Sequence, residues 1–254
     1  MRIAVVGGTG SLGALVAATL AARGEEVRVL SRRAPAVPPA PGVVHHRVDL
    51  ADGEGLAAAL AGVEAVVDAA NALARARAVL VEGTAALLAA EDAAGVGHHV
   101  AVSIVGCDRV PLAYYRAKVA QEQAVVRGPV WWSLLRATQF HPLLDAVFAA
   151  TARLGVVPSG RQRLQPVDPR IVAARVVEAL AAGPGGRLPD LAGPQVETLA
   201  QLARTWRAAR GRRALALPVP SLVRAGRAMR AGGLCAPAAA AGGPTFAQWL
   251  EERR

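Results

Sequence analysis

The 254-residue sequence predicts an α/β fold built on a doubly wound parallel sheet, and two observations carry this prediction. First, the apolar residues 3–6 lead into a glycine-rich stretch, residues 7–13, which is followed by a helical pattern at residues 15–20. Second, short apolar segments alternate with helical patterns as far as Leu135. Alternation of this kind is typical of a parallel sheet covered by helices on both faces.

The elements follow one another in a regular order. After the first strand we expect strands at residues 26–31, 43–48, 63–69, 99–104 and 130–135. Helices are expected at residues 15–20, 56–61, 76–94 and 114–126, and a proline-rich loop at residues 34–42. Right-handed crossovers would then join the strands.

The pattern changes after Arg136. Asp168 and Pro169 are typical of a helix start, and this helix should run to about Ala181. Beyond it we expect a returning strand at 188–192, amphipathic helices at 197–210 and 221–230, a loop at 232–243 and a closing helix around Phe246, Trp249 and Leu250. We therefore predict a dinucleotide-binding domain over residues 1–150 and a small substrate-binding region over residues 151–254 that partly returns to the sheet.

The composition favours a cytoplasmic protein. No apolar run reaches the roughly 18 uncharged residues of a membrane span, and the glycine-rich stretch interrupts the first apolar segment too early for a signal peptide. Cys107 and Cys235, the only cysteines, suggest a reducing compartment. The histidine pairs 45–46 and 98–99 lack a carboxylate cluster, so we expect no metal site.

The formal net charge of +10 allows two interpretations. A basic surface can bind nucleic acid. However, nearly all 29 cations are arginines spread along the chain, and the densest group, residues 204–213, has a helical rhythm that fits a solvated face. We expect a small-molecule substrate, no membrane partner, no nucleic-acid partner and a monomer or homodimer.

The glycine-rich stretch has the pattern of a dinucleotide-binding turn. Gly7 allows the tight turn, Gly10 lets the backbone approach a pyrophosphate, and Gly13 lets the following helix pack closely. Backbone N–H groups around Thr9, Ser11 and Leu12, at the start of the helix, would face the phosphates.

The end of the second strand favours NADP(H) over NAD(H). An NAD-binding fold of this class carries an acidic residue there, which binds the ribose 2′-hydroxyl. This sequence has Ser31, Arg32 and Arg33 instead. Two guanidinium groups and a hydroxyl can hold a 2′-phosphate. The alternative is a pair of solvated loop arginines.

The stretch from Tyr114 to Lys118 is the second chemical signal. Lys118 is the only lysine, and Tyr114 and Tyr115 are the only tyrosines. Helical spacing places Tyr114 and Lys118 on one face, where an ammonium stabilises a phenolate and suits the tyrosine to proton transfer. Ser103, near the end of the fifth strand, could donate to a substrate carbonyl.

These motifs together resemble the short-chain dehydrogenase/reductase superfamily, in its atypical NmrA-like or isoflavone-reductase-like branch. The resemblance implies adenine contacts at Asp49 and Leu50. It also implies a cofactor loop at the three residues after the fourth strand, Ala69, Ala70 and Asn71, and nicotinamide contacts from the segment with Thr138 and Phe140. Lys118 would bind the cofactor ribose as well as tune Tyr114.

We therefore expect an NADP(H)-dependent oxidoreductase on a Rossmann fold that transfers hydride between nicotinamide and a small, largely apolar carbonyl or alcohol substrate. Tyr114, Lys118 and Ser103 would be catalytic. Two alternatives stay open: an NADP-sensing regulatory protein without catalysis, and a nucleotide-dependent epimerase or dehydratase.

Overall fold

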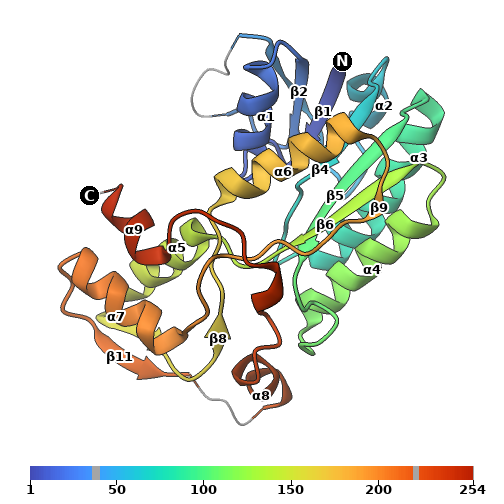
Figure 1. Cartoon of the computed structure of the whole chain (residues 1–254). Helices are drawn as coiled ribbons and strands as arrows, with labels where there is room; N and C mark the ends of the chain where they lie inside the picture. The colour runs from blue at the N-terminus through green and yellow to red at the C-terminus, as the bar shows by residue number, and fades with distance from the viewer. Residues whose placement is uncertain (36–40, 220–222, 254) are drawn as a thin grey trace. The chain divides into compact units, whose positions relative to one another are not determined.

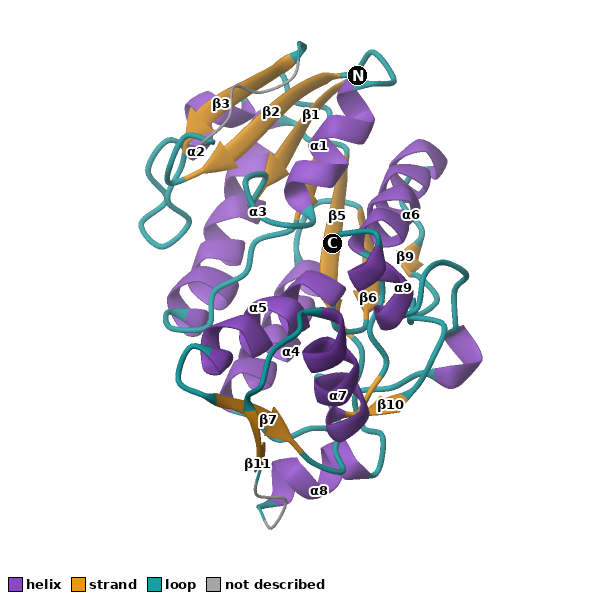
Figure 2. Cartoon of the chain, turned by 90° about the vertical axis from the view of Figure 1, so that its left-hand side faces the viewer, coloured by secondary structure: helices purple, strands orange, loops and turns teal. Residues whose placement is uncertain are grey.

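A seven-stranded parallel sheet forms the framework of the chain in the computed structural model, which describes residues 1–35, 41–219 and 223–253 (Figure 1). The strands in spatial order are β3 (Val43–Arg47), β2 (Glu26–Ser31), β1 (Arg2–Val6), β4 (Ala65–Asp68), β5 (His98–Ile104), β6 (Trp132–Ala137) and β9 (Gly186–Arg187). Figure 2 shows β3, β2 and β1 side by side. The predicted doubly wound α/β fold is confirmed.

The strand order reverses between β1 and β4. From β1 the chain builds β2 and β3 on one side, and then crosses to build β4, β5 and β6 on the other. In open sheets of this kind, ligands bind where the order reverses, beyond the carboxyl ends of the strands. The loop after β1 and the loop after β4 both start at this point.

The helices between the strands follow the predicted order. They are α1 (Gly13–Ala21), α2 (Leu56–Leu60), α3 (Gly83–Ala94), α4 (Ala113–Arg127) and α6 (Pro169–Ala182). A π-helical turn, η1 (Ala78–Glu82), precedes α3, so the helix expected at 76–94 forms with one widened turn. Asp168 accepts a hydrogen bond from the Arg170 N–H at 2.8 Å and caps α6 as predicted.

The chain folds as two compact units that interleave along the sequence. The first comprises residues 1–103, 116–135 and 172–188, and the second comprises residues 104–115, 136–171 and 189–254. The division at residue 150 into a cofactor domain and a substrate region stays a prediction.

The second unit has a core of its own, in which Leu144, Phe148, Trp206, Phe246 and Trp249 are buried together. Three of its helices correspond to the helices predicted in this part of the chain: α7 (Leu199–Ala209), α8 (Arg224–Arg230) and α9 (Phe246–Glu251). The elements that the sequence did not predict are α5 (His141–Ala152), a 3₁₀ turn (Pro237–Ala239), the parallel pair β7 (Val156–Ser159) and β11 (Leu215–Pro218), and the antiparallel pair β8 (Arg163–Leu164) and β10 (Glu197–Thr198).

Three predicted boundaries in the C-terminal part need correction. The strand that joins the sheet is Gly186–Arg187 and not 188–192, where Leu191 and Ala192 make isolated bridges, to Ala137 and to Ala240. Residues 197–198 pair as β10, and α7 starts only at Leu199 because Thr198 forms a capping box with Gln201. The expected start of the helix at 221 lies outside the described residues.

Among the described residues, no helix combines the length and the apolar content that a bilayer crossing requires.

Candidate functional site

The glycine turn after β1 is held in place by backbone contacts. Gly7 has φ +70°, donates to the Leu30 carbonyl at 2.9 Å, and accepts from the Gly10 N–H at 2.9 Å. A Cβ atom at Gly7 would lie 2.9 Å from the Ala69 carbonyl oxygen, so the loops after β1 and β4 touch. The tight turn predicted at Gly7 is therefore present at the reversal of strand order.

The two later glycines of the turn differ in their surroundings. A Cβ atom at Gly13 would clash with the Gly7 carbonyl oxygen and lie 2.7 Å from the Gly8 Cα atom, so α1 packs directly on the turn. At Gly10 a Cβ atom would meet only the Gly7 carbonyl oxygen, at 3.2 Å, within the described residues. Gly13 thus serves packing, and Gly10 keeps the outer face of the turn accessible.

The start of α1 offers backbone donors to a ligand. Thr9, Gly10 and Ser11 are exposed, and Leu12 is buried beneath them. No side chain in the described part of the chain caps α1. An uncapped helix start with an exposed turn fits the phosphates of a dinucleotide, because its N–H groups and the helix dipole both attract anions.

The end of β2 presents two exposed arginines, Arg32 and Arg33. The Ser31 hydroxyl donates to the Arg33 carbonyl oxygen at 2.7 Å, so its single hydrogen is already used. The ring nitrogen Nε2 of His45 on β3 lies 2.9 Å from the same hydroxyl oxygen and therefore donates to it. In this structure Ser31 shapes the turn that carries the arginines, whereas its contact with a 2′-phosphate stays a prediction.

The loops after β3 and β4 carry the residues expected to contact the cofactor, and in each loop one of these residues is buried and another is accessible. Asp49 accepts from the Ala51 N–H at 3.0 Å, and Leu50 is buried in the core of the first unit. After β4, Ala70 is buried and Asn71 is exposed, with Ala69 between these extremes. Their contacts with the adenine and the rest of the cofactor stay predictions.

Lys118 lies almost completely inside the first unit, with 3% of its surface exposed. Its ammonium donates to the Val102 carbonyl oxygen at 2.9 Å and to the Gln121 side-chain oxygen at 2.6 Å. Val102 precedes Ser103, which is also buried. The only lysine of the chain therefore reaches the end of β5 next to the predicted catalytic serine.

The two tyrosines at the start of α4 have different surroundings. Tyr115 packs against the core of the second unit, and this burial, with Tyr114 and Cys107 nearby, raises the pKa of Tyr115 to about 12. Tyr114 is half-buried, with its ring centroid 5.4 Å from that of Tyr115. Tyr114 lies one helical turn before Lys118 on the same helix, and the catalytic pairing of the two residues stays a prediction.

Thr138 and Phe140 belong to the second unit. Thr138 is buried and its hydroxyl accepts from the Gly193 N–H at 3.2 Å. Phe140 is half-buried and immediately precedes α5. Their predicted contacts with the nicotinamide stay untested.

Three buried polar residues near the candidate site were not identified from the sequence. Gln121 accepts a hydrogen bond from the Lys118 ammonium in the first unit, and its side-chain amide donates to Asp68 and to Thr84. A polar residue at the end of an otherwise apolar strand, Asp68, was the one signal that could have drawn attention to them.

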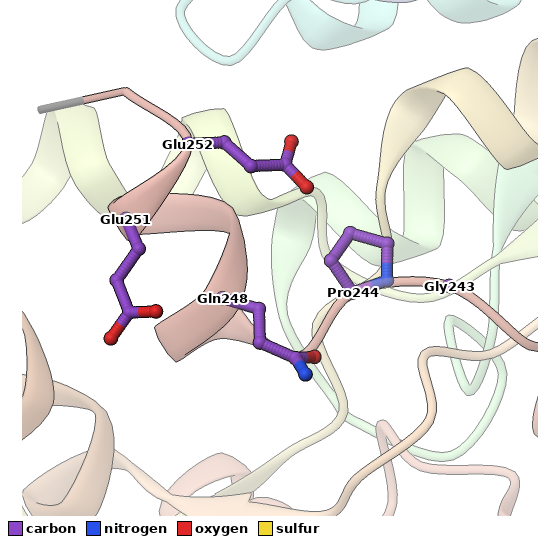
Figure 3. Close-up of a pocket in the computed structure, with 5 residues that line it drawn as sticks. All are labelled: Gly243, Pro244, Gln248, Glu251 and Glu252. Carbon is purple, nitrogen blue, oxygen red and sulfur yellow. The ribbon is translucent and has the colours of Figure 1, made fainter.

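Metal-ligand clusters and surface cavities are two further places where a ligand could bind. Within the described residues, no three histidine, cysteine, aspartate or glutamate side chains gather as metal ligands would. A shallow cavity of about 500 Å³ in the second unit is lined by Gly243, Pro244, Gln248, Glu251 and Glu252 (Figure 3). Its two glutamates would repel phosphates, so it does not suit a dinucleotide.

The comparison with protein families decides the assignment. A family model described as NAD(P)H-binding matches residues 7–183, from the glycine turn to the end of α6. The chain belongs to the NAD(P)H-binding family. This agrees with the resemblance to the atypical short-chain dehydrogenases/reductases. As a family member the chain binds NAD(P)H, and the choice between the two cofactors is treated below as a proposal.

Solved structures of the same fold include several NAD(P)-binding proteins. An NADPH-dependent quinone oxidoreductase from Escherichia coli, complexed with NADPH, has a TM-score of 0.79 at 20% identity, and 99% of each chain is covered. A nucleoside-diphosphate-sugar epimerase from Staphylococcus aureus also has a TM-score of 0.79, at 16% identity, covering 99% of this chain and 100% of that one.

A third structure, the enzyme WbmG from Bordetella bronchiseptica in complex with NAD, has a TM-score of 0.70 at 19% identity, covering 87% of this chain and 81% of that one. No curated protein matches the sequence. These likenesses show the fold.

Proposed function

We propose that this NAD(P)H-binding protein is an NADP(H)-dependent oxidoreductase of the short-chain dehydrogenase/reductase type, acting on a small carbonyl or alcohol. The observation that carries the proposal is the buried position of Lys118. In a chain that otherwise uses arginine for every cation, the one lysine follows Tyr114 by one helical turn and reaches the backbone beside Ser103. A compact ammonium suits this position, and a larger, planar guanidinium does not.

Each residue has a distinct task in this proposal. The Tyr114 phenol gives a proton to the carbonyl oxygen in reduction and takes it back in oxidation. The Lys118 ammonium favours the phenolate form of Tyr114 and binds ribose hydroxyls. The Ser103 hydroxyl donates to the substrate oxygen and orients it. Bound NADPH supplies the hydride.

Discrimination between cofactors is assigned to the end of β2. Arg32 and Arg33 are exposed there and no carboxylate follows the strand, so a 2′-phosphate meets two cations and no anion. A charge-assisted hydrogen bond of this kind contributes about 1.5–3 kcal/mol. NADPH should therefore bind more tightly than NADH.

A reductase assay tests the proposal. The purified protein is mixed with NADPH and a panel of quinones, ketones and aldehydes, and the loss of NADPH absorbance is followed. The quinones belong in the panel because the Escherichia coli structure described above is that of a quinone oxidoreductase. Turnover that depends on Tyr114 supports the proposal. Tight NADPH binding without turnover of any substrate would favour an NADP-sensing regulatory protein instead.

A second candidate is a nucleotide-sugar epimerase. The equal TM-score and full coverage of the Staphylococcus aureus epimerase support it. An epimerase passes hydride from the sugar to the oxidised cofactor and then returns it. Conversion of a nucleoside-diphosphate sugar in the presence of NADP+ or NAD+, without net formation of the reduced cofactor, would therefore distinguish it from the reductase.

A further inference from the structure

The Lys118 side chain is buried, and the Gln121 side chain accepts a hydrogen bond from its ammonium. The 2.6 Å bond from the ammonium to the Gln121 side-chain oxygen joins residues three positions apart on α4, which face the same side of the helix. Gln121 is itself only 3% exposed, so its amide must find partners inside the first unit.

The orientation of this amide follows from its neighbours. An ammonium can only donate, so the amide oxygen must face Lys118 and the amide nitrogen must face the other way. There the nitrogen meets the Asp68 carboxylate at 2.9 Å and the Thr84 hydroxyl at 3.2 Å. An ionised carboxylate can only accept, which fixes the same orientation from the opposite end.

Asp68 supplies the negative charge of this arrangement. It is fully buried at the end of β4, and a buried ammonium is costly without an opposite charge nearby. Gln121 links the Asp68 carboxylate to the Lys118 ammonium, so a negative charge lies one hydrogen-bonded side chain away from the ammonium.

The second oxygen of Asp68 accepts from the Ala70 N–H at 2.9 Å. Ala70 belongs to the loop after β4 that is predicted to contact the cofactor. One carboxylate thus fixes both this loop and, through Gln121, the lysine on α4.

We propose that Asp68 and Gln121 are positioning residues that hold the Lys118 ammonium at the end of β5 in register with the loop after β4. This rests on the proposed function in one respect, the role given to Lys118 toward the cofactor. The positioning itself can be measured without any cofactor.

The first measurement uses the fact that Lys118 is the only lysine. Protein grown on lysine labelled with nitrogen-15 at the side chain gives one ammonium signal in NMR. Burial and the hydrogen bonds to Val102 and Gln121 should protect its protons from exchange with water. We expect Gln121→Met, which keeps the shape but removes both polar groups, to abolish this protection. Gln123→Met, an exposed neighbour on the same helix, should leave the signal unchanged.

Moving the negative charge from position 68 to position 121 tests whether the polar contacts, and not packing alone, hold the ammonium. Gln121→Glu alone sets two carboxylates against each other and should also disturb the signal. The double variant Gln121→Glu/Asp68→Asn restores a single negative charge. The amide introduced at position 68 can donate to the carboxylate introduced at position 121, while its oxygen still faces Ala70. We expect this double variant to recover the protected signal. A role for Gln121 in packing alone predicts no recovery, and that result would overturn the proposal.

NADPH titration then links positioning to the cofactor. Gln121→Met should weaken NADPH binding by about tenfold, as expected for the loss of one hydrogen bond to a charged group, and the double variant should return to within about threefold of the original Kd. If Lys118→Met leaves NADPH affinity unchanged while the ammonium signal behaves as predicted, the role of Lys118 in the proposed function is wrong and the positioning stands. If the signal in Gln121→Met is the same as in the unmodified protein, the positioning is wrong.

Discussion

Two glycines of the same turn should separate folding from cofactor binding. A side chain at Gly13 meets backbone atoms, the Gly7 carbonyl oxygen and the Gly8 Cα atom at 2.7 Å, which cannot rotate away. A side chain at Gly10 meets one atom, the Gly7 carbonyl oxygen, at 3.2 Å. Gly13→Ala should therefore damage the fold, and Gly10→Val should damage the site.

The magnitudes follow from these distances. Overpacking of a tight contact costs about 1–3 kcal/mol, and the better helix propensity of alanine returns up to about 1 kcal/mol. We expect Gly13→Ala to lower the free energy of unfolding by about 1–2 kcal/mol. Gly10→Val is an exposed change and should alter it by less than about 1 kcal/mol. Its branched side chain should nevertheless weaken NADPH binding by about 10- to 100-fold, because the phosphates can no longer approach the backbone donors.

Urea unfolding and NADPH titration on both variants test this pair of expectations. Gly24→Ala is the control for the loss of a glycine away from the site, because a Cβ atom there meets no other atom within 4 Å although φ is +81°. Normal NADPH affinity in Gly10→Val, together with an unchanged circular dichroism spectrum, would refute the placement of the pyrophosphate. Unchanged stability in Gly13→Ala would refute the packing argument.

Three further predictions concern the proposed chemistry and the second unit. Tyr114→Phe should lower turnover of a carbonyl substrate by about 10²–10⁴, whereas Tyr115→Phe, at a buried phenol held neutral, should change turnover much less; equal effects in a steady-state assay would contradict this. The double variant Arg32→Ala/Arg33→Ala should lose most of its preference for NADPH over NADH, measured as the ratio of Kd values, and an unchanged ratio would place the 2′-phosphate elsewhere. Burial lowers the pKa of His141 to about 4, below its usual 6.5, so the stability this gives is present above pH 6.5 and is lost as the pH falls toward 4. His141→Phe should flatten this part of the pH dependence of urea unfolding by on the order of 2–3 kcal/mol, and an unaltered profile would assign the loss to other groups.

The physical cause of the His141 shift can be read from its contacts. Its Nε2 atom donates to the Pro244 carbonyl oxygen at 3.1 Å, and its ring stacks with Phe246. The other ring nitrogen is buried and meets no partner in the described structure. Protonation would place an N–H group there without an acceptor, which is costly inside a protein.

The sequence predicted the first unit well because its signals are local. The strand Glu26–Ser31 was predicted with both ends correct, since a glycine precedes it and two arginines follow it. The helix α3 is followed by Gly95, whose φ of +73° is the left-handed conformation expected of a glycine that ends a helix. The turn at Gly7–Gly13 was recognised from the spacing of its own glycines.

The second unit and the lysine network depend on contacts between distant residues. The strand pairing of Leu215 with Val156 joins short segments that have little strand character alone. The bond between Gln121 and Asp68 spans 53 positions, and neither residue belongs to a motif. Helix α5 was not predicted because its exposed face carries the apolar residues Leu143 and Val147, so its sequence lacks the regular alternation of apolar and polar faces of an amphipathic helix.

The contribution of α9 to the core of the second unit sets the order in which the chain can fold during synthesis. Phe246, Trp249 and Leu250 complete a cluster that also contains Leu144 and Trp206. The first unit contains no residue beyond Leu188, so all of its residues have been synthesised before the second unit is complete. The second unit exposes an incomplete apolar core until Phe246, Trp249 and Leu250 have left the exit tunnel of the ribosome. We therefore expect chaperones to bind ribosome-bound chains that stop before Phe246.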